Sequence, residues 1–247
     1  MELGFRYFLN QPFFKKIIII NIIVFLLPLV LNTFLFLFNL KQFSLINYFD
    51  LHPGIGDIIR SPWTLISYSF FHIDFFHIFW NMLILYVVCK HFLNFLTNKK
   101  LIEIYFYGAL MGGLFFVISY NIFPVFKNAF SPLIGSSAAV YAVLIFACSY
   151  MPNTRVNLIF FDIRLKYLGL FYVLLSLIQI PFSNAGGNIA HLGGAFYGFY
   201  YAKNFNLSNS PFDFIISFIN NFKYKPKENR DNQKKIDNIL DKISKSG

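Results

Sequence analysis

The chain has 247 residues, of which 57% are hydrophobic and 35 are phenylalanine, and its mean hydropathy is +0.56. This is too apolar for an ordinary soluble domain, so the composition indicates a polytopic membrane protein surrounded by the lipid bilayer. The formal net charge is +10. A nucleic-acid-binding protein needs a soluble basic domain, whereas the aromatic residues here lie in apolar segments, so nucleic acid is excluded as a partner.

Apolar segments recur along the chain and predict an all-α bundle of six transmembrane helices. A helix needs about 20 mainly apolar residues to cross about 30 Å of hydrocarbon, and shorter helices are tolerated inside a bundle. The fifth and sixth segments are short, and an interrupted apolar stretch at 61–72 blurs the start of the second. The predicted spans are 17–38, 75–95, 101–120, 133–151, 167–182 and 188–202.

The basic residues fall mostly in alternate loops, and this asymmetry predicts the orientation. Of the 21 Lys and Arg residues, 18 lie before the first span, after the fourth or sixth, or in and after the last turns of the second, where Lys90 is counted. The other three are Lys41, Arg60 and Lys127. Because Lys and Arg accumulate on the cytoplasmic side, both termini are expected to be cytoplasmic. The loops after spans one, three and five are then external.

The first apolar segment and the overall composition bear on location. The segment is too long for the core of a cleaved signal peptide and lacks a small-residue cleavage site, so we expect it to remain as an anchor. Richness in Phe, Ile, Asn and Lys indicates an AT-biased genome. The expected location is therefore the bacterial plasma (inner) membrane, crossed several times by the chain.

A serine and a histidine lie beside small residues near the starts of two segments. Gly135-Ser136-Ser137-Ala138 opens the fourth, and Ala190-His191 opens the sixth. Both segments start externally, so Ser137 and His191 are predicted about 6 to 7 Å inside their helices, at similar depth. A lone membrane serine usually bonds a carbonyl of its own helix, whereas a histidine in lipid typically faces a cavity or a partner. Together the two residues indicate a nucleophile and its base.

Small residues indicate that these two helices approach closely. They form one stripe at Ala138 and Ala142, and another at Gly186, Ala190, Gly194 and Gly198. Such stripes serve general bundle packing and also let two backbones lie close together. The Ser137 hydroxyl could then reach His191 at about 2.6 to 3.2 Å, the separation needed for proton removal.

The pattern predicts a catalytic dyad, because no acidic residue is well placed to complete a triad. Asp74 and Glu103 are the only carboxylates in or near the spans, and each lies at a helix start. Tyr141, one turn after Ser137, is expected to orient the imidazole by stacking its ring on it. The chain contains no His-Glu-x-x-His motif and no cysteines at metal-ligand spacing, so neither a metal nor a cofactor is expected.

Two further polar residues lie in the second span. His77 and Asn81 are four residues apart and therefore share one helix face. Alone, they are compatible with ordinary cross-links between helices. The combined motifs, however, resemble the rhomboid family of intramembrane serine proteases over about residues 63–201. They are Gly135-Ser136-Ser137-Ala138, Ala190-His191 with the glycines at 186, 194 and 198, and His72, His77 and Asn81.

The resemblance implies roles for individual residues. Ser137 would be the nucleophile and His191 the general base. His77, Asn81 and backbone N–H groups near the serine, including that of Ser136, would bind the oxyanion. Such donors contribute about 2.7 to 4 kcal/mol each in soluble proteases.

Three features depart from the pattern of that family. Ala138 stands where many members have glycine, which narrows the space beside the serine. Trp63-Thr64 stands where many have Trp-Arg, although Arg60 is nearby. The adjacent serines mean that only the motif register selects Ser137 over Ser136. The loop at 39–62 is implied to be a structured element lying partly in the outer leaflet.

We therefore expect residues 1–204 to form a six-span rhomboid protease core and residues 205–247 a cytoplasmic tail. The tail contains apolar patterns for short interfacial or amphipathic helices at 212–222 and 236–243, although an unstructured tail is compatible with the same residues. The expected function is an intramembrane serine endopeptidase that cleaves transmembrane segments of other membrane proteins. The alternative is a catalytically inactive rhomboid-like protein that binds transmembrane clients. No oligomeric state is predicted.

Overall fold

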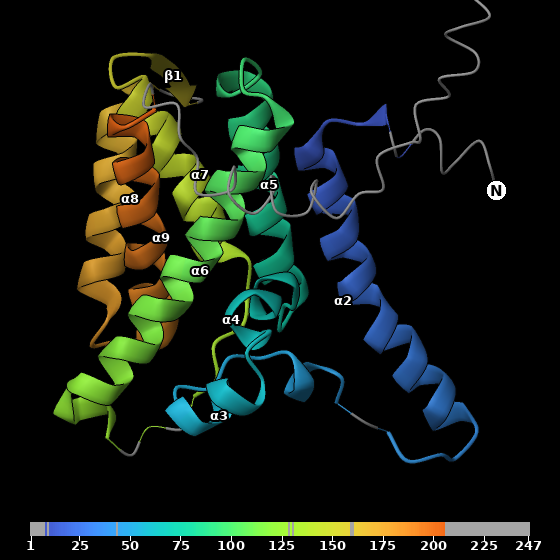
Figure 1. Cartoon of the computed structure of the whole chain (residues 1–247). Helices are drawn as coiled ribbons and strands as arrows, with labels where there is room; N and C mark the ends of the chain where they lie inside the picture. The colour runs from blue at the N-terminus through green and yellow to red at the C-terminus, as the bar shows by residue number, and fades with distance from the viewer. Residues whose placement is uncertain are drawn as a thin grey trace, which may run out of the picture. The chain divides into compact units, whose positions relative to one another are not determined.

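The computed structural model describes residue 8 and residues 10–42, 44–127, 129, 131–158 and 161–205. All belong to the first of two compact units, Met1–Leu207 and Ser208–Gly247. The predicted tail helices at 212–222 and 236–243 lie outside the described residues. The α-helices are α2 (Phe13–Leu37), α3 (Ile55–Arg60), α4 (Thr64–Ser67), α5 (Phe75–Phe92), α6 (Asn98–Ile122), α7 (Ser137–Tyr150), α8 (Leu165–Gln179) and α9 (Ala185–Lys203) (Figure 1).

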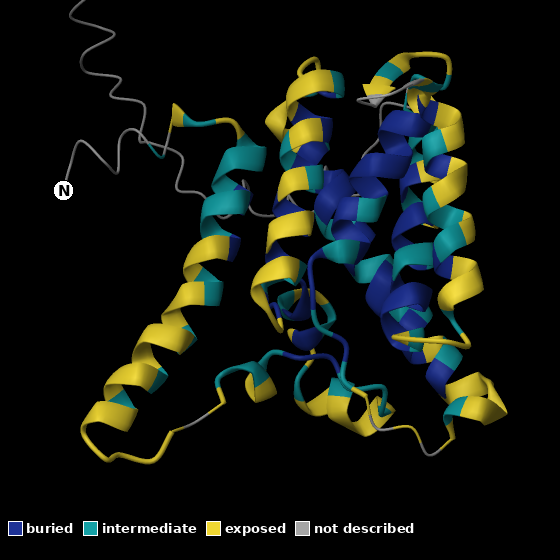
Figure 2. Ribbon diagram, turned by 180° about the vertical axis from the view of Figure 1, so that it is seen from behind, coloured by how far each residue is buried: buried dark blue, intermediate teal, exposed yellow. Residues whose placement is uncertain are grey.

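Three helices, α2, α5 and α6, are long and apolar enough to cross a membrane by length and composition. α7 and α8 are apolar but shorter, with 14 and 15 residues. α9 has 19 residues, which is long enough, but it is not among the helices that are apolar enough to cross a membrane. Only two of the 25 residues of α2, Ile17 and Asn21, are buried, and its C-terminal half is mostly exposed (yellow in Figure 2) although its side chains are apolar, which suits a helix in contact with lipid. The structure therefore confirms a mostly helical chain with three candidate membrane spans among the described residues.

α7, with 14 residues, is the most enclosed helix of the bundle. Ten of its 14 residues are buried, and it is dark blue in Figure 2. Its neighbours include α6 and α9, whose glycines lie against its backbone or methyl groups. A helix that contacts other helices along its length does not need to match the full thickness of the hydrocarbon layer.

Small residues allow α6, α7 and α9 to lie unusually close together. A Cβ atom added to certain glycines of α6 would collide with alanine methyl groups of α7. A Cβ atom added to certain glycines of α9 would collide with alanine carbonyl groups of α7. The colliding pairs are Gly108 with Ala142, Gly112 with Ala138, Gly194 with Ala138 and Gly198 with Ala142. The close approach predicted from the small-residue stripes is thus present, and α6 contributes glycines that the prediction omitted.

The start of α7 differs from the prediction. The sequence predicts the fourth span from residue 133, whereas the helix begins at Ser137. Leu133 instead pairs with Leu51, each backbone N–H donating to the other residue's carbonyl at 3.0 and 2.8 Å. Gly135 then adopts a φ of +124°, which only glycine accommodates readily. Ser137 is therefore the first residue of its helix rather than a residue more than one turn inside it.

Two strands lie where the sequence predicts only a basic loop between the fourth and fifth spans. β1 (Arg155–Leu158) and β2 (Phe161–Arg164) form an antiparallel hairpin in which Arg155 is opposite Arg164. Short 3-10 turns occupy the loops elsewhere, namely η1 (Ile46–Tyr48), η2 (Tyr68–Phe70) and η3 (Pro124–Phe126). The all-α prediction is thus correct for the bundle but misses this hairpin.

The contact between α7 and α9 can be tested with a single methyl group. We expect Gly194→Ala to lower the free energy of unfolding by about 1 to 3 kcal/mol, because the new Cβ would overlap the Ala138 carbonyl. The measurement is unfolding of the purified protein in detergent micelles. Gly56→Ala is the matched control, since a Cβ there has nothing within 4 Å and should change stability by less than about 1 kcal/mol. Equal stability of the two variants would contradict the close contact.

Candidate active site

Ser137 follows a glycine turn that is held by neighbouring elements. The Gly135 N–H donates to the Tyr68 carbonyl at 3.0 Å. A Cβ on Gly135 would lie 2.6 Å from His77 Nε2 and 3.7 Å from Ser137 Oγ. The His77 imidazole and the Ser137 hydroxyl therefore lie on the same side of this turn, and glycine is needed both for the positive φ and for the space that His77 fills.

The two adjacent serines have different surroundings. Ser136 is fully buried, and its hydroxyl lies 3.0 Å from Nε2 of the buried His72. The Ser136 N–H also points to that nitrogen, at 3.5 Å. Ser137 is only partly buried. Of the two hydroxyls, that of Ser137 is the more accessible, whereas the Ser136 N–H is engaged with His72, so its predicted role at the oxyanion stays a prediction.

His77 and Asn81 lie on one face of α5, as their spacing predicts. The helix begins after Asp74, whose carboxylate accepts a hydrogen bond from the His77 N–H at 2.9 Å. The imidazole of His77 lies beside the turn that precedes Ser137. Asn81 is buried, and its side-chain nitrogen donates to the His77 carbonyl at 2.9 Å. Only His77 is thus shown near the serine, and the oxyanion role of both residues stays a prediction.

The His191 ring is stacked on Tyr141. The ring centroids are 4.2 Å apart and the planes differ by 12°. Tyr141 follows Ser137 by four residues on α7, so the stack lies one helical turn beyond the serine on the same face. α9 begins after Asn184, whose side chain accepts a hydrogen bond from the Gly187 N–H. The stacking geometry expected from the sequence is therefore present.

Ser176 of α8 is a site residue that the sequence prediction missed. Its hydroxyl lies 3.3 Å from His191 Nδ1 and donates to the Tyr141 hydroxyl at 3.0 Å. It is buried, at 1% exposure. The third member of a catalytic triad is usually a carboxylate, and no spacing rule relates a serine of α8 to a histidine of α9. The sequence signal that could have indicated Ser176 is that it is a serine within an otherwise apolar segment.

The dyad contact itself is not formed in this state. In the part of the chain that the structure describes, no hydrogen bond joins Ser137 to His191. Catalytic hydrogen bonds are often long in free enzymes and shorten when substrate binds. The roles of Ser137 and His191 as nucleophile and base therefore stay predictions.

The methyl group of Ala138, one of the departures from the family pattern, has a place in the packing. Ala138 is completely buried, and its Cβ fills the space left by the missing side chain of Gly112 on α6. A Cβ on Gly112 would also lie 2.9 Å from the Ala190 carbonyl of α9. The extra methyl beside the serine is thus accommodated on the side of α6.

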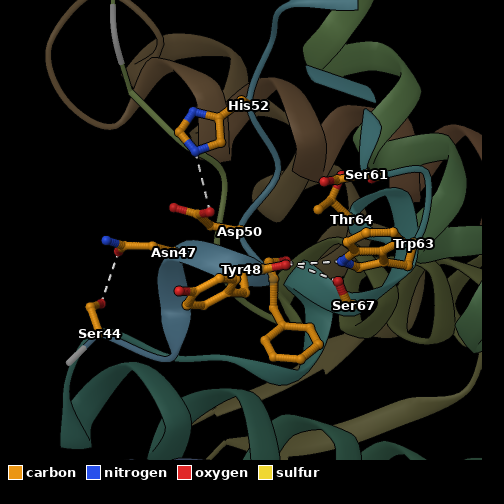
Figure 3. Close-up of polar contacts among 10 residues, drawn as sticks. Ser44, Asn47, Tyr48, Asp50, His52, Ser61, Trp63, Thr64 and Ser67 are labelled. Carbon is orange, nitrogen blue, oxygen red and sulfur yellow. Dashed lines mark hydrogen bonds and ion pairs between the residues drawn. The ribbon is translucent and has the colours of Figure 1, made fainter. Parts of the chain in front are cut away.

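The long loop before α5 is ordered, as the family resemblance implies. Trp63 is half exposed and its indole N–H donates to the Tyr48 carbonyl at 2.9 Å (Figure 3). His52 Nε2 lies 3.3 Å from the carboxylate of Asp50. A polar cavity of about 240 Å³ lies in this loop, and its lining includes Arg60 and Thr64. Arg60 therefore lies near the position where many family members have arginine.

Within the described residues, no group of three or more His, Cys, Asp or Glu side chains is placed to hold a metal ion. Cys89 and Cys148 are both buried and unpaired by disulfide. The site is thus built from hydroxyl, imidazole and backbone groups. The expectation that no cofactor is needed stays a prediction.

The described residues form a helical bundle with three candidate membrane spans, and a family model matches this part of the chain. The model of the Rhomboid domain matches residues 60–205, more than half of the chain. The chain belongs to the rhomboid family.

Several curated proteins are similar to this chain. Presenilin-associated rhomboid-like protein, mitochondrial, from Mus musculus is 27% identical over 168 residues, covering 65% of this chain and 42% of the relative. The Homo sapiens protein of that name is also 27% identical over 168 residues, covering 65% and 41%. RHOMBOID-like protein 12, mitochondrial, from Arabidopsis thaliana is 31% identical over 144 residues, covering 53% and 43%. The matched part of this chain spans less than half the length of these relatives.

These relatives contradict the location predicted from composition. The sequence predicts a bacterial plasma membrane with cytoplasmic termini, whereas the similar proteins are named as mitochondrial. The prediction was wrong because it rested on an AT-rich amino-acid composition, which reports the base composition of a genome rather than a compartment.

The glycine before the two serines gives a direct test of the turn. We expect Gly135→Ala to cost about 1 to 3 kcal/mol of unfolding free energy, because alanine is strained at a φ of +124° and its methyl would overlap His77. Gly54→Ala is the control, since Gly54 has an ordinary φ of −67° and its new methyl would meet only the flexible Asp57 side chain. The two thermal unfolding curves should differ clearly, and coincident curves would argue against the described turn.

A double-mutant cycle tests the place of the Ala138 methyl. Gly112→Ala should destabilise the protein by about 1 to 3 kcal/mol, because its Cβ would overlap that methyl. Adding Ala138→Gly should recover part of the loss, with a coupling of about 0.5 to 3 kcal/mol measured by unfolding of all four proteins. Strictly additive effects would show that the two positions do not touch.

Proposed function

We propose that this chain is an intramembrane serine endopeptidase that cleaves transmembrane segments of other membrane proteins. The observation that supports this most is the arrangement at α7 and α9. Ser137 is partly exposed at the first turn of α7, and one turn further along the same helix Tyr141 holds the His191 ring by stacking. Membership of the rhomboid family, which contains many such proteases, supports the same proposal.

In the proposed reaction, Ser137 Oγ attacks the carbonyl carbon of the scissile peptide bond while His191 Nε2 accepts the hydroxyl proton. The carbonyl oxygen becomes an oxyanion, and the C–N bond then breaks as the imidazolium returns the proton to the leaving amine. Water, activated by His191 in the same way, hydrolyses the acyl-enzyme and frees Ser137. Each step conserves protons between the serine, the imidazole and the substrate.

The oxyanion would be stabilised by fixed donors around the start of α7. The first N–H groups of a helix have no partner within it, and the helix dipole places partial positive charge there. Ser137 is the first residue of α7, so the oxyanion would form at this end. His77 lies beside the same turn, and Asn81 would contribute the second N–H of its amide, since the first donates to the His77 carbonyl.

The proposed topology has six spans, α2 and α5 to α9, with the basic loops on one side of the membrane. Of the three helices that do not meet the span criteria, α7 would be enclosed within the bundle, which its burial supports. α8, of which only three residues are buried, would pack on the outside of the bundle. From the names of the relatives, we propose a mitochondrial membrane as the location. The expected substrate is a transmembrane helix weakened by glycine or another poor helix former near the membrane surface.

A second candidate function is a catalytically inactive protein that binds transmembrane clients. Two observations favour it: the described residues contain no Ser137 to His191 hydrogen bond, and the Ser136 N–H points to His72. Substrate binding would have to correct both features in a working protease.

The deciding experiment uses the full chain in liposomes with a single-span model substrate that has glycine near one membrane surface. We expect cleavage by the wild type and a loss of at least about a thousandfold in Ser137→Ala and His191→Ala. A fluorophosphonate should label the wild type and neither variant.

Ser149→Ala is the matched control, because it removes a serine hydroxyl from the far end of the same helix. Its rate should equal that of the wild type. If the wild type were as inert as Ser137→Ala, and both retained the substrate on purification, the protein would be a client-binding member of the family.

A further inference from the structure

The histidine of the proposed dyad has a hydrogen-bond partner on a third helix. Ser176 Oγ lies 3.3 Å from His191 Nδ1 and 3.0 Å from the Tyr141 hydroxyl. Ser176 is 1% exposed, so its hydroxyl is enclosed by protein atoms. In the part of the chain that the structure describes, this is the only hydrogen bond of the His191 ring.

This contact differs from the usual behaviour of a serine in a membrane helix. Such a hydroxyl typically donates to the carbonyl one turn earlier in its own helix, which for Ser176 is that of Tyr172. Ser176 instead directs its hydroxyl away from α8, towards one residue of α7 and one of α9. A role confined to stabilising α8 does not account for that direction.

The proposed reaction needs one tautomer of His191. Nε2 must have a free lone pair to accept the Ser137 proton, so in a neutral imidazole Nδ1 bears the N–H. Ser176 Oγ, 3.3 Å from Nδ1, is placed to accept that N–H, and its own proton is placed to go to the Tyr141 oxygen at 3.0 Å.

We propose that Ser176 is the positioning residue of the catalytic histidine, in place of the carboxylate of a triad. This rests on the proposed protease function. Ser176 fixes the Nδ1–H tautomer, and Tyr141 both stacks on the ring and holds the Ser176 hydroxyl in orientation. When His191 becomes an imidazolium, the Ser176 oxygen still accepts from Nδ1–H, and no buried carboxylate needs to be paired.

The first measurement reads the tautomer without using activity. Protein labelled with ¹⁵N-histidine is studied by NMR in detergent micelles, and the His191 signals are assigned by their loss in His191→Gln. We expect Nδ1–H in the wild type and in Ser176→Thr, which keeps a hydroxyl, and a mixture of both tautomers in Ser176→Ala. A wild-type ring protonated at Nε2 overturns the inference, whether or not Ser176→Ala folds.

The second measurement is cleavage of the single-span substrate. Ser176→Ala should lower kcat about tenfold to a hundredfold with KM unchanged, which is the size of loss seen when the hydrogen-bond partner of a metal-binding histidine is removed. Ser176→Thr should recover most of the rate, and Ser149→Ala should match the wild type.

The two readouts separate the two hypotheses. An inactive wild type that still shows Nδ1–H, lost in Ser176→Ala, would reject the protease function and keep the positioning of His191. An active wild type whose Ser176→Ala variant keeps both kcat and the tautomer would reject the positioning role alone.

Discussion

The close approach of three helix backbones is the constraint on which the rest of the site depends. Ala138 and Ala142 of α7 lie between glycines of α6 and glycines of α9, with no side chain larger than a methyl group at these contacts. Because the bilayer interior offers little hydrophobic drive for helix association, van der Waals packing of this kind determines which helices are neighbours. The spacing of α7 and α9 in turn lets the rings of Tyr141 and His191 stack.

Much of this arrangement is predictable from the sequence because it depends on local periodicity. Glycine at intervals of four identifies the face of α9 that contacts α7, and the four-residue spacing of His77 and Asn81 places both on one side of α5. Tyr141 is predictable for the same reason, since it is one turn from Ser137. Each of these inferences needs only the geometry of a single helix and one partner.

The parts that the sequence did not predict depend on contacts between distant segments. The start of α7 is fixed by the pairing of Leu51 with Leu133, 82 residues apart, and hydropathy alone extends the span through Leu133. Ser176 reaches His191 only because α8 packs beside α7 and α9. The predicted location in a bacterial plasma membrane was also wrong, because amino-acid composition reflects the base composition of the genome and not the cellular compartment.

The pairing of Leu51 with Leu133 has a consequence for the proposed protease function. It joins the loop before α5 to the backbone only four residues before Ser137, so the two cannot shift independently. The loop also presents the half-exposed Trp63, whose side-chain type favours the boundary between lipid and water. If the chain is the protease proposed above, the position of this loop at that boundary would set the depth of Ser137 below the membrane surface. A thinner or thicker bilayer would then change which residue of a substrate helix meets the hydroxyl.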